Sequence, residues 1–232
     1  MPSDPHCYTP LQLCGLRVAQ LDSSGAPDPG ANNGYSTDAA ISAGISLEFS
    51  EGDEFELKNG CGSVCATFED CDKLKRAEIT IDLCSLDAEL LSLLVDGSTL
   101  FTEDGDSIGW EAPPLTAPCP FGVSIELWTK AWNLDNQALA PYLGGATPSY
   151  FRFFFPKVSF RVGDITLEND FARTPVIGKA STNPSMSLHG PFGDFPFGVH
   201  SAGGITNLYG WFIDDAPPAA TCGFITVPAI TS

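Results

Sequence analysis

The sequence predicts a mainly β protein that carries one short helix and long loops. Several segments alternate apolar and polar residues with a period of two, which is the pattern of half-buried strands. Only one segment has the spacing of an amphipathic helix, and the connecting segments are rich in glycine and proline. Because 232 residues can form one large β domain with its own core, we expect a single domain over residues 1–232.

The clearest alternation predicts a hairpin over residues 41–58. Its apolar residues all fall on odd positions: Ile41, Ile45, Leu47, Phe49, Phe55 and Leu57. Gly44 lies within the first strand, where the missing Cβ would admit a close neighbour. Neither strand contains proline, and lysine occurs only at the end, as Lys58. Strand edges without such blocking residues favour pairing with another chain, so we predict that this hairpin is an assembly surface.

The common parity of the two strands also predicts the turn. Paired residues share a face, so Phe49 is expected opposite Phe55 and Glu48 opposite Glu56. A three-residue loop over residues 51–53 satisfies this register, and its central glycine can supply the positive φ that such loops favour.

The same parity places Glu48, Glu54 and Glu56 together on one face of the predicted hairpin. Two interpretations of this acidic face stay open: an ordinary solvated surface, or the lining of a functional surface. The opposite, apolar face is expected to pack on the core of the subunit.

Further strands are predicted at residues 15–22, 78–83, 121–131, 150–162, 207–214 and 222–227, with another strand pair or arm within 165–177. The alternation changes phase at Pro156, which predicts a bulge or a corner. The segments expected to be irregular are residues 1–14, 23–37, 59–75, 100–120 and 181–204. One helix is predicted after Ser85 as N-cap and before Gly97. Its core-facing stripe consists of Leu86, Leu90, Leu93 and Leu94.

Two tryptophans stand out because they belong to the polar face of a predicted strand. Trp128 alternates with the apolar residues of segment 121–131. Trp132 is the residue directly after this segment. Such side chains either pack under a loop or press against a neighbouring subunit.

The charge balance excludes a nucleic-acid-binding protein. The net charge is −18, from 11 basic and 29 acidic residues, whereas a nucleic-acid binder needs an excess of cations. No apolar run approaches the length of a membrane span, so no membrane partner is expected. The first residues lack the basic flank and apolar stretch of a signal peptide, so we expect synthesis in the cytoplasm.

The cysteines do not have the spacing of a metal site. The chain contains eight: Cys7, Cys14, Cys61, Cys65, Cys71, Cys84, Cys119 and Cys222. The spacing of the central group is not the paired pattern of zinc sites, so we expect no bound metal and no cofactor. The thiols are expected to be buried, with disulfides formed after release from the cell as the alternative.

The sequence contains no recognisable catalytic constellation. Its three histidines, His6, His189 and His200, are scattered, and no zinc-protease or serine-hydrolase motif is present. Because acidic residues are so abundant, any chosen carboxylate pair is uninformative. We therefore expect a protein that is not an enzyme.

Several segments, taken in their order along the chain, carry a resemblance to a known family. They are residues 14–18 (CGLRV), 53–60 (DEFELKNG), 81–84 (IDLC) leading into 88–93 (AELLSL), 154–158 (FFPKV), 165–171 (ITLENDF) and 178–184 (GKASTNP). Their order resembles that of the major tail protein, or tail tube protein, of long-tailed phages that infect actinobacteria. The likeness covers roughly residues 14–196. It leaves the N-terminal arm, residues 1–14, at its margin, and it does not place the strands and loops of residues 197–232.

This resemblance implies a tail-tube-type β-sandwich or barrel with one flanking helix. Six subunits would form a ring, and the rings would stack into a non-contractile tube whose inner barrel is built from the subunits' hairpins. Glu48, Glu54 and Glu56 would face the channel, through which genomic DNA passes without specific binding. Other tail proteins, namely the tape measure, terminator and distal tail proteins, would be the further partners in the virion. A carbohydrate- or receptor-binding β-sandwich module of a virion, using Trp128 and Trp132, is the alternative.

Overall fold

A computed structural model describes most of the chain and is mainly β, as the sequence predicts. The described residues are 8–117, 120–134, 138–139, 149–165, 174–187, 189–193, 205, 207–218 and 222–229. In this part of the chain, no helix has the length and apolar character needed to cross a membrane.

The described elements are fourteen strands and one helix. They are β1 (Tyr8–Gln20), β2 (Gly30–Thr37), β3 (Ala40–Ser50), β4 (Glu54–Lys58), β5 (Val64–Glu69), β6 (Lys73–Leu83), α1 (Ala88–Val95), β7 (Ser98–Phe101), β8 (Ser107–Glu111), β9 (Val123–Asn133), β10 (Ala138–Leu139), β11 (Tyr150–Val162), β12 (Thr174–Ala180), β13 (Gly210–Asp214) and β14 (Gly223–Val227).

Ten strands form one antiparallel sheet, which we call the body together with α1. The strand order is β14-β2-β1-β9-β11-β12-β6-β3, while β10 pairs with β9 and β13 pairs with β11. Buried side chains from both halves of this order belong to one hydrophobic core, so the sheet curls around it. β3 and β14 are the two ends of the main strand order.

The core is built from the alternating positions that the sequence predicts. On β6, the odd-numbered residues from Ala77 to Leu83 are buried, and the apolar residues of β9 lie beside them in the same cluster. The strand predicted at 121–131 begins later, at Val123, and Phe121 precedes it and is exposed.

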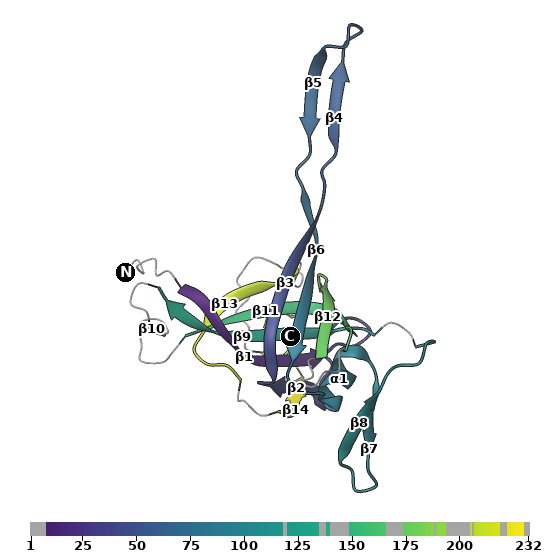
Figure 1. Cartoon of the computed structure of the whole chain (residues 1–232), viewed down its shortest axis with the longest axis vertical. Coiled ribbons are helices and arrows are strands. Elements are labelled where there is room, and N and C mark those ends of the chain that lie inside the picture. Colours follow the sequence, from purple (N-terminus) through teal and green to yellow (C-terminus); the bar gives the residue numbers. More distant parts are fainter. Residues whose placement is uncertain are drawn as a thin grey trace.

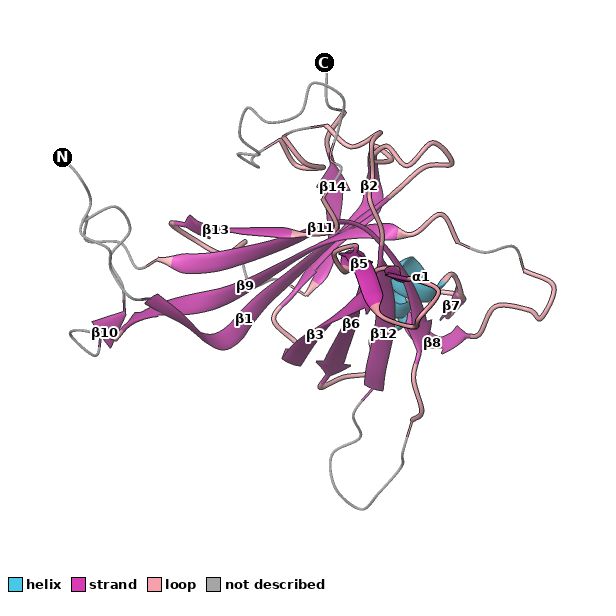
Figure 2. Ribbon diagram, turned by 90° about the horizontal axis from the view of Figure 1, so that it is seen from above, coloured by secondary structure: helices cyan, strands magenta, loops and turns pink. Residues whose placement is uncertain are grey.

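The predicted helix is present, with different caps. The side chain of Asp87, not Ser85, accepts hydrogen bonds from the backbone N–H groups of Glu89 and Leu90, each at 3.1 Å. Asp96 ends the helix with a φ of 62°, one residue before the predicted Gly97. The buried stripe is Leu90, Leu91 and Leu94, while Leu86 lies outside the helix and is exposed. Figure 2 shows α1 at one side of the body, next to β7 and β8.

The predicted irregularity at Pro156 is confirmed. The register between β11 and β9 shifts between Phe155 and Val158, while β11 continues as one strand to Val162. The part of β11 that follows the shift, from Val158 to Val162, pairs with β12.

Strands occur in several segments that we expected to be irregular, and two of these strands belong to the body. β1 begins at Tyr8, and Pro10 is tolerated because this half of β1 pairs only with β9 and leaves its other edge open. β2 lies within the glycine-rich segment 23–37. Its Gly34 is needed for close packing and not for a turn, because a Cβ there would lie 2.9 Å from Ile225 Cγ1.

Two hairpins project from the body in opposite directions (Figure 1). The shorter one is β7–β8, which lies in the segment that we expected to be turn-rich and irregular. The longer one extends β3 and β6 beyond the body and ends in β4 and β5. Of the arm expected at 165–177, residues 166–173 lie outside the described residues, and the part from Thr174 belongs to β12.

Candidate assembly arm

The predicted hairpin over residues 41–58 is one side of a longer arm, which we define as residues 40–83. β3 pairs with β6, so that Phe49 lies opposite Leu74 and not opposite Phe55. β4 pairs with β5 in a separate two-stranded sheet, which we call the distal ribbon. The predicted strands are thus present, but the predicted pairing between them is wrong.

The predicted turn at residues 51–53 is a narrow junction between the root of the arm and its distal ribbon. The N–H of Gly52 donates to Asp72 Oδ1 at 3.0 Å, and the N–H of Asp70 donates to the carbonyl of Asp53 at 3.0 Å. A Cβ on Gly52 would lie 1.9 Å from the carbonyl oxygen of Asp70. Gly52 is therefore required by a close contact between two strands, and the chain does not reverse there.

The reversal occurs at residues 59–63, at the tip of the arm. The N–H of Asn59 donates to the carbonyl of Ser63 at 2.9 Å, and the Asn59 side chain accepts from the N–H groups of Cys61 and Ser63. Gly62 adopts a φ of 84°, which supplies the left-handed residue of the turn.

The distal ribbon has an apolar face that its own chain leaves uncovered. Phe55 lies opposite Phe68, and Leu57 lies opposite Ala66 on the same face. Phe55 is 71%, Leu57 67% and Phe68 64% exposed. The expectation that Phe55 and Leu57 pack on the subunit core is therefore wrong, because the ribbon stands away from the body (Figure 1).

The opposite face of the distal ribbon is acidic. Glu54 lies directly opposite Glu69, and Glu56 lies opposite Thr67. The alternation that places Glu54 and Glu56 away from Phe55 is confirmed. Glu56 forms an exposed ion pair with Lys58 at 2.8 Å.

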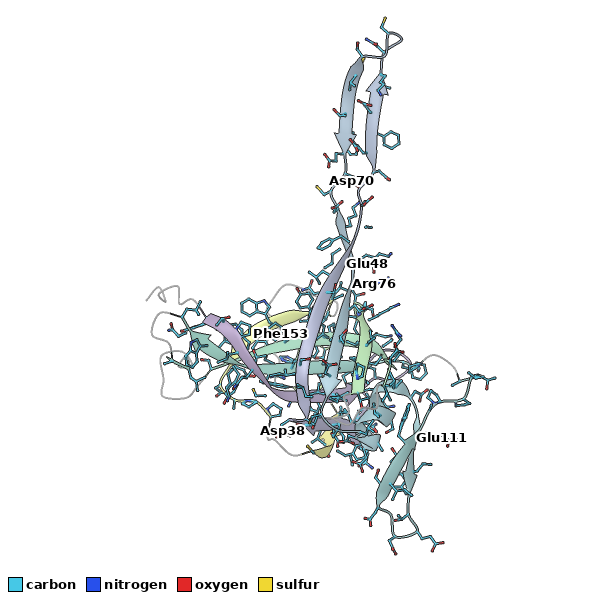
Figure 3. The ribbon with its side chains drawn as sticks, in the orientation of Figure 1. Asp38, Glu48, Asp70, Arg76, Glu111 and Phe153 are labelled. Atoms are coloured by element: carbon cyan, nitrogen blue, oxygen red, sulfur yellow. The ribbon has the colours of Figure 1, made fainter. Side chains whose placement is uncertain are left out.

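Glu48 has a different setting from these two carboxylates, because it lies at the root of the arm beside two cations. It accepts from Lys75 Nζ at 2.9 Å and also pairs with Arg76, which is its neighbour across the strands (Figure 3). The Lys75 hydrogen bond, with the Arg76 contact, lowers the pKa of the Glu48 carboxyl from its ordinary value. The negative charge of Glu48 is therefore balanced by two neighbouring cations, in contrast to that of Glu54.

The first strand of the arm is also open to solvent along its length. β3 is an edge of the ten-stranded sheet, and its large apolar residues are all more than a third exposed: Ile41, Ile45, Leu47 and Phe49. Gly44 has open space around its missing Cβ, whose nearest neighbour would be the Thr80 carbonyl oxygen at 4.0 Å. The expected contact with the subunit core is wrong for Phe49, which is 53% exposed.

The cysteines of the arm are exposed, so the expectation of buried thiols is wrong for them. Cys61, Cys65 and Cys71 are free and exposed, as are Cys84 and Cys222, while Cys14 is half-buried. Burial raises the pKa of the Cys14 thiol, with a smaller opposing effect from Lys130. Among the described residues, no three metal-ligating side chains lie together.

Trp128 is not a surface residue, so it cannot contact a carbohydrate, whereas Trp132 is only half-buried. It is 1% exposed and packs between the guanidinium groups of Arg17 and Arg152, whose Cζ atoms lie 5.2 and 4.9 Å from its ring centre. Both arginines pair with the buried Glu126. Of the two predicted outcomes, packing inside the subunit is confirmed for Trp128.

The sequence interpretation missed the second strand of the distal ribbon. The apolar residues Val64, Ala66 and Phe68 alternate there, but the run is short and interrupted by cysteine and threonine. We assigned this segment to a cysteine-bearing loop. The alternation of three even-numbered positions was the signal that could have identified it.

Neither the known protein-family models nor the curated proteins contain a match to this chain.

Proposed function

We propose that this chain is a structural subunit of a non-contractile phage tail tube. Six copies form a ring, the rings stack into a tube in the virion, and the genome passes through its channel during ejection. The tape measure, terminator and distal tail proteins are its further partners. The subunit is made in the host cytoplasm and performs no catalysis.

The uncovered apolar face of the distal ribbon carries this proposal. A single two-stranded hairpin is marginally stable in water unless its apolar face is covered. Phe55, Leu57 and Phe68 are each more than 60% exposed, and contiguous exposed apolar side chains of this kind mark interaction sites. The arm thus supports a role in assembly.

The open strand edge supports identical copies as the partner. β3 is a long edge strand without proline or lysine, which an isolated subunit would leave open to indiscriminate pairing. Closure of identical copies into a ring removes such edges. The net charge of −18 supports passage of DNA without adhesion, because an acidic wall repels phosphates.

Electron microscopy of the purified protein tests the proposal. We expect negatively stained rings or tubes of uniform width from the wild-type chain. A protein that remains monomeric in sedimentation velocity at high concentration and low salt would exclude the proposed role.

A variant without the distal ribbon sharpens this test. Ser50 lies opposite Lys73, so residues 51–72 can be replaced by an Asn-Gly turn that joins β3 to β6 in their native register. We expect this variant to keep the circular dichroism of a folded β protein and to form no tubes. Tubes of normal length from the shortened chain would show that the distal ribbon is dispensable.

A further inference from the structure

Three cations on the outer face of the body have no counter-ion among the residues that the structure describes. They are Lys157 and Arg161 of β11 and Lys179 of β12, which we call the cationic strip. The alternate residues Val158 and Phe160 are buried in the core, so the strip belongs to the opposite, outward face of the sheet.

The absence of partners is specific to this strip. In the part of the chain that the structure describes, every other lysine or arginine has a polar partner: Arg17, Lys58, Lys73, Lys75, Arg76, Lys130 and Arg152. Glu78 lies directly across from Lys179 on β6, yet the two form no ion pair. In a chain with 29 acidic and 11 basic residues, three neighbouring cations that no described residue pairs with point to an anionic partner outside the subunit.

On the acidic face of the distal ribbon, two carboxylates lack a cationic partner among the described residues. Glu54 and Glu69 lie directly opposite each other, and neither carboxylate has a cationic partner among the described residues. Like charges in directly opposed positions destabilise a strand pair. A set of cations placed against this face would remove that repulsion.

The two surfaces also match in size. Lys179 lies one strand across and two residues along from Arg161, because it pairs with Ser159. Strand geometry then separates their Cα atoms by about 8 Å. Glu54 and Glu69 are about 5 Å apart, and Glu56 follows about 7 Å further along the ribbon. The long side chains of lysine and arginine can span the remaining differences.

A single copy cannot join these surfaces, because its distal ribbon projects away from the sheet that carries the strip (Figure 1). We propose that the acidic face of the distal ribbon in one copy binds the cationic strip of a second copy. This inference rests on the proposed function and names one contact within the assembly. It gives Glu54 and Glu56 a different place from the channel wall expected on the basis of sequence.

We expect the contact to fix where the ribbon of one copy lies on its neighbour more than to add to the affinity between copies. Exposed ion pairs are individually weak and are screened by salt, and two or three of them together change an assembly equilibrium measurably. We expect the protein concentration at half-assembly to rise about tenfold when the strip is neutralised. Raising the salt from about 0.05 to 0.5 M should have a similar effect on the wild type and little effect on the neutralised variant.

A charge exchange tests the proposed pairing. The first variant carries Arg161→Glu and Lys179→Glu, the second carries Glu54→Lys and Glu69→Lys, and the third combines all four. Each of the first two should assemble poorly, and the combined variant should recover. Lys130→Glu is a control, because Lys130 is a cation of β9 that donates to Gln12 and lies outside the strip. It should leave assembly unchanged.

A pair of uncharged substitutions is needed as well, because glutamate at position 179 would face Glu78 and could disturb the fold. Arg161→Gln with Lys179→Gln removes the charge without that repulsion, and circular dichroism with thermal unfolding reports on the fold. If the wild type assembles and the folded glutamine variant assembles equally well at low salt, the strip has no role, although the proposed function survives. A wild type that stays monomeric overturns both.

A second outcome would reassign the strip to nucleic acid. A fluorescently labelled 20-base-pair duplex is titrated with the wild type and with the glutamine variant at low salt. We expect no binding by either, because the net charge is −18. Duplex binding that requires Arg161 and Lys179, with no effect of Glu54→Lys on assembly, would overturn the contact between copies.

Discussion

The body and the distal ribbon use the same antiparallel pairing but bury it very differently. β9 has paired neighbours on both edges and is covered on both faces, so that most of its residues are buried. β4 and β5 pair only with each other, and every one of their residues is exposed. Backbone pairing shapes both regions, but only the body gains the burial that stabilises a sheet in water. The stability of the ribbon must therefore depend on what covers it.

The largest effect is expected in the body, at its buried charge network. Arg152 contacts Glu126 at 2.9 Å and Asp214 at 3.0 Å, and both Arg152 and Glu126 are about 1% exposed. Arg152→Ala leaves Glu126 with one cation fewer in a dry site, which we expect to lower the free energy of unfolding by about 3–5 kcal/mol. Urea denaturation followed by tryptophan fluorescence measures this change.

Arg161→Ala provides the matched control, because it removes the same side chain from an exposed position on the same strand. Its effect on unfolding of the monomer should stay within about 0.5 kcal/mol. Equal losses from both arginines would contradict the contrast between buried and exposed positions.

The second prediction concerns the apolar face of the ribbon. Phe55→Ser with Phe68→Ser should leave the urea midpoint of the body unchanged, because neither ring contacts the core. Assembly should fail, since each buried phenylalanine contributes about 1.5–3 kcal/mol to a contact. Sedimentation velocity and microscopy report the loss, and Ile108→Ser serves as control because it removes an exposed apolar side chain from β8, outside the ribbon. Normal tubes from the serine variant would mean that the face stays exposed in the assembly.

A smaller effect is expected at the junction between the two regions. Gly52→Ala forces a Cβ against the Asp70 carbonyl oxygen, so the strands must separate locally at a cost of about 1–3 kcal/mol. Gly44→Ala is its control, because the space beside Gly44 is open. Hydrogen exchange of the ribbon amides should accelerate in the first variant and not in the second. Unchanged exchange with Gly52→Ala would show that the junction adapts freely.

The smallest effect is expected from pH at the root of the arm. The pKa of Glu48 is lower in the folded chain than its ordinary value of 4.5. The ion pairs of Glu48 therefore stabilise the folded chain fully above pH 4.5, and this stabilisation is lost as the pH falls through the folded pKa. Above pH 5 the root should therefore be insensitive to pH. An NMR titration of the Glu48 carboxyl carbon measures the shift, which Lys75→Met should reduce. A midpoint above 4.5 would contradict the ion pairs.

Local patterns predicted the strands better than their partners. The alternation at residues 41–49 and 78–83 identified β3 and β6, because burial on one face imposes a period of two. Parity favoured Phe55 as the partner of Phe49, because Leu74 comes opposite Phe49 only through a register shift between Glu48 and Phe49. That choice depends on non-local packing, where β6 is held between β3 and β12.

Charge and exposure in the candidate site were only partly predictable. The common face of Glu54 and Glu56 follows from alternation, and the structure has it. The neutralisation of Glu48 by Lys75 and Arg76 requires the β3–β6 register, which joins residues far apart in the sequence. The exposure of Phe55 could not be read from its neighbours, because an apolar residue on an alternating strand is ordinarily a core residue.

The continuity of β3 and β6 from the body into the arm has a mechanical consequence. A pull on the distal ribbon acts along these strands, while their ladder of hydrogen bonds lies across them. Many hydrogen bonds therefore carry the load at once, in shear, and they do not break one after another. β6 also transmits part of the load sideways to β12. The arm is thereby anchored as a tether that resists tension along its length and yields more readily to a sideways peel of β3.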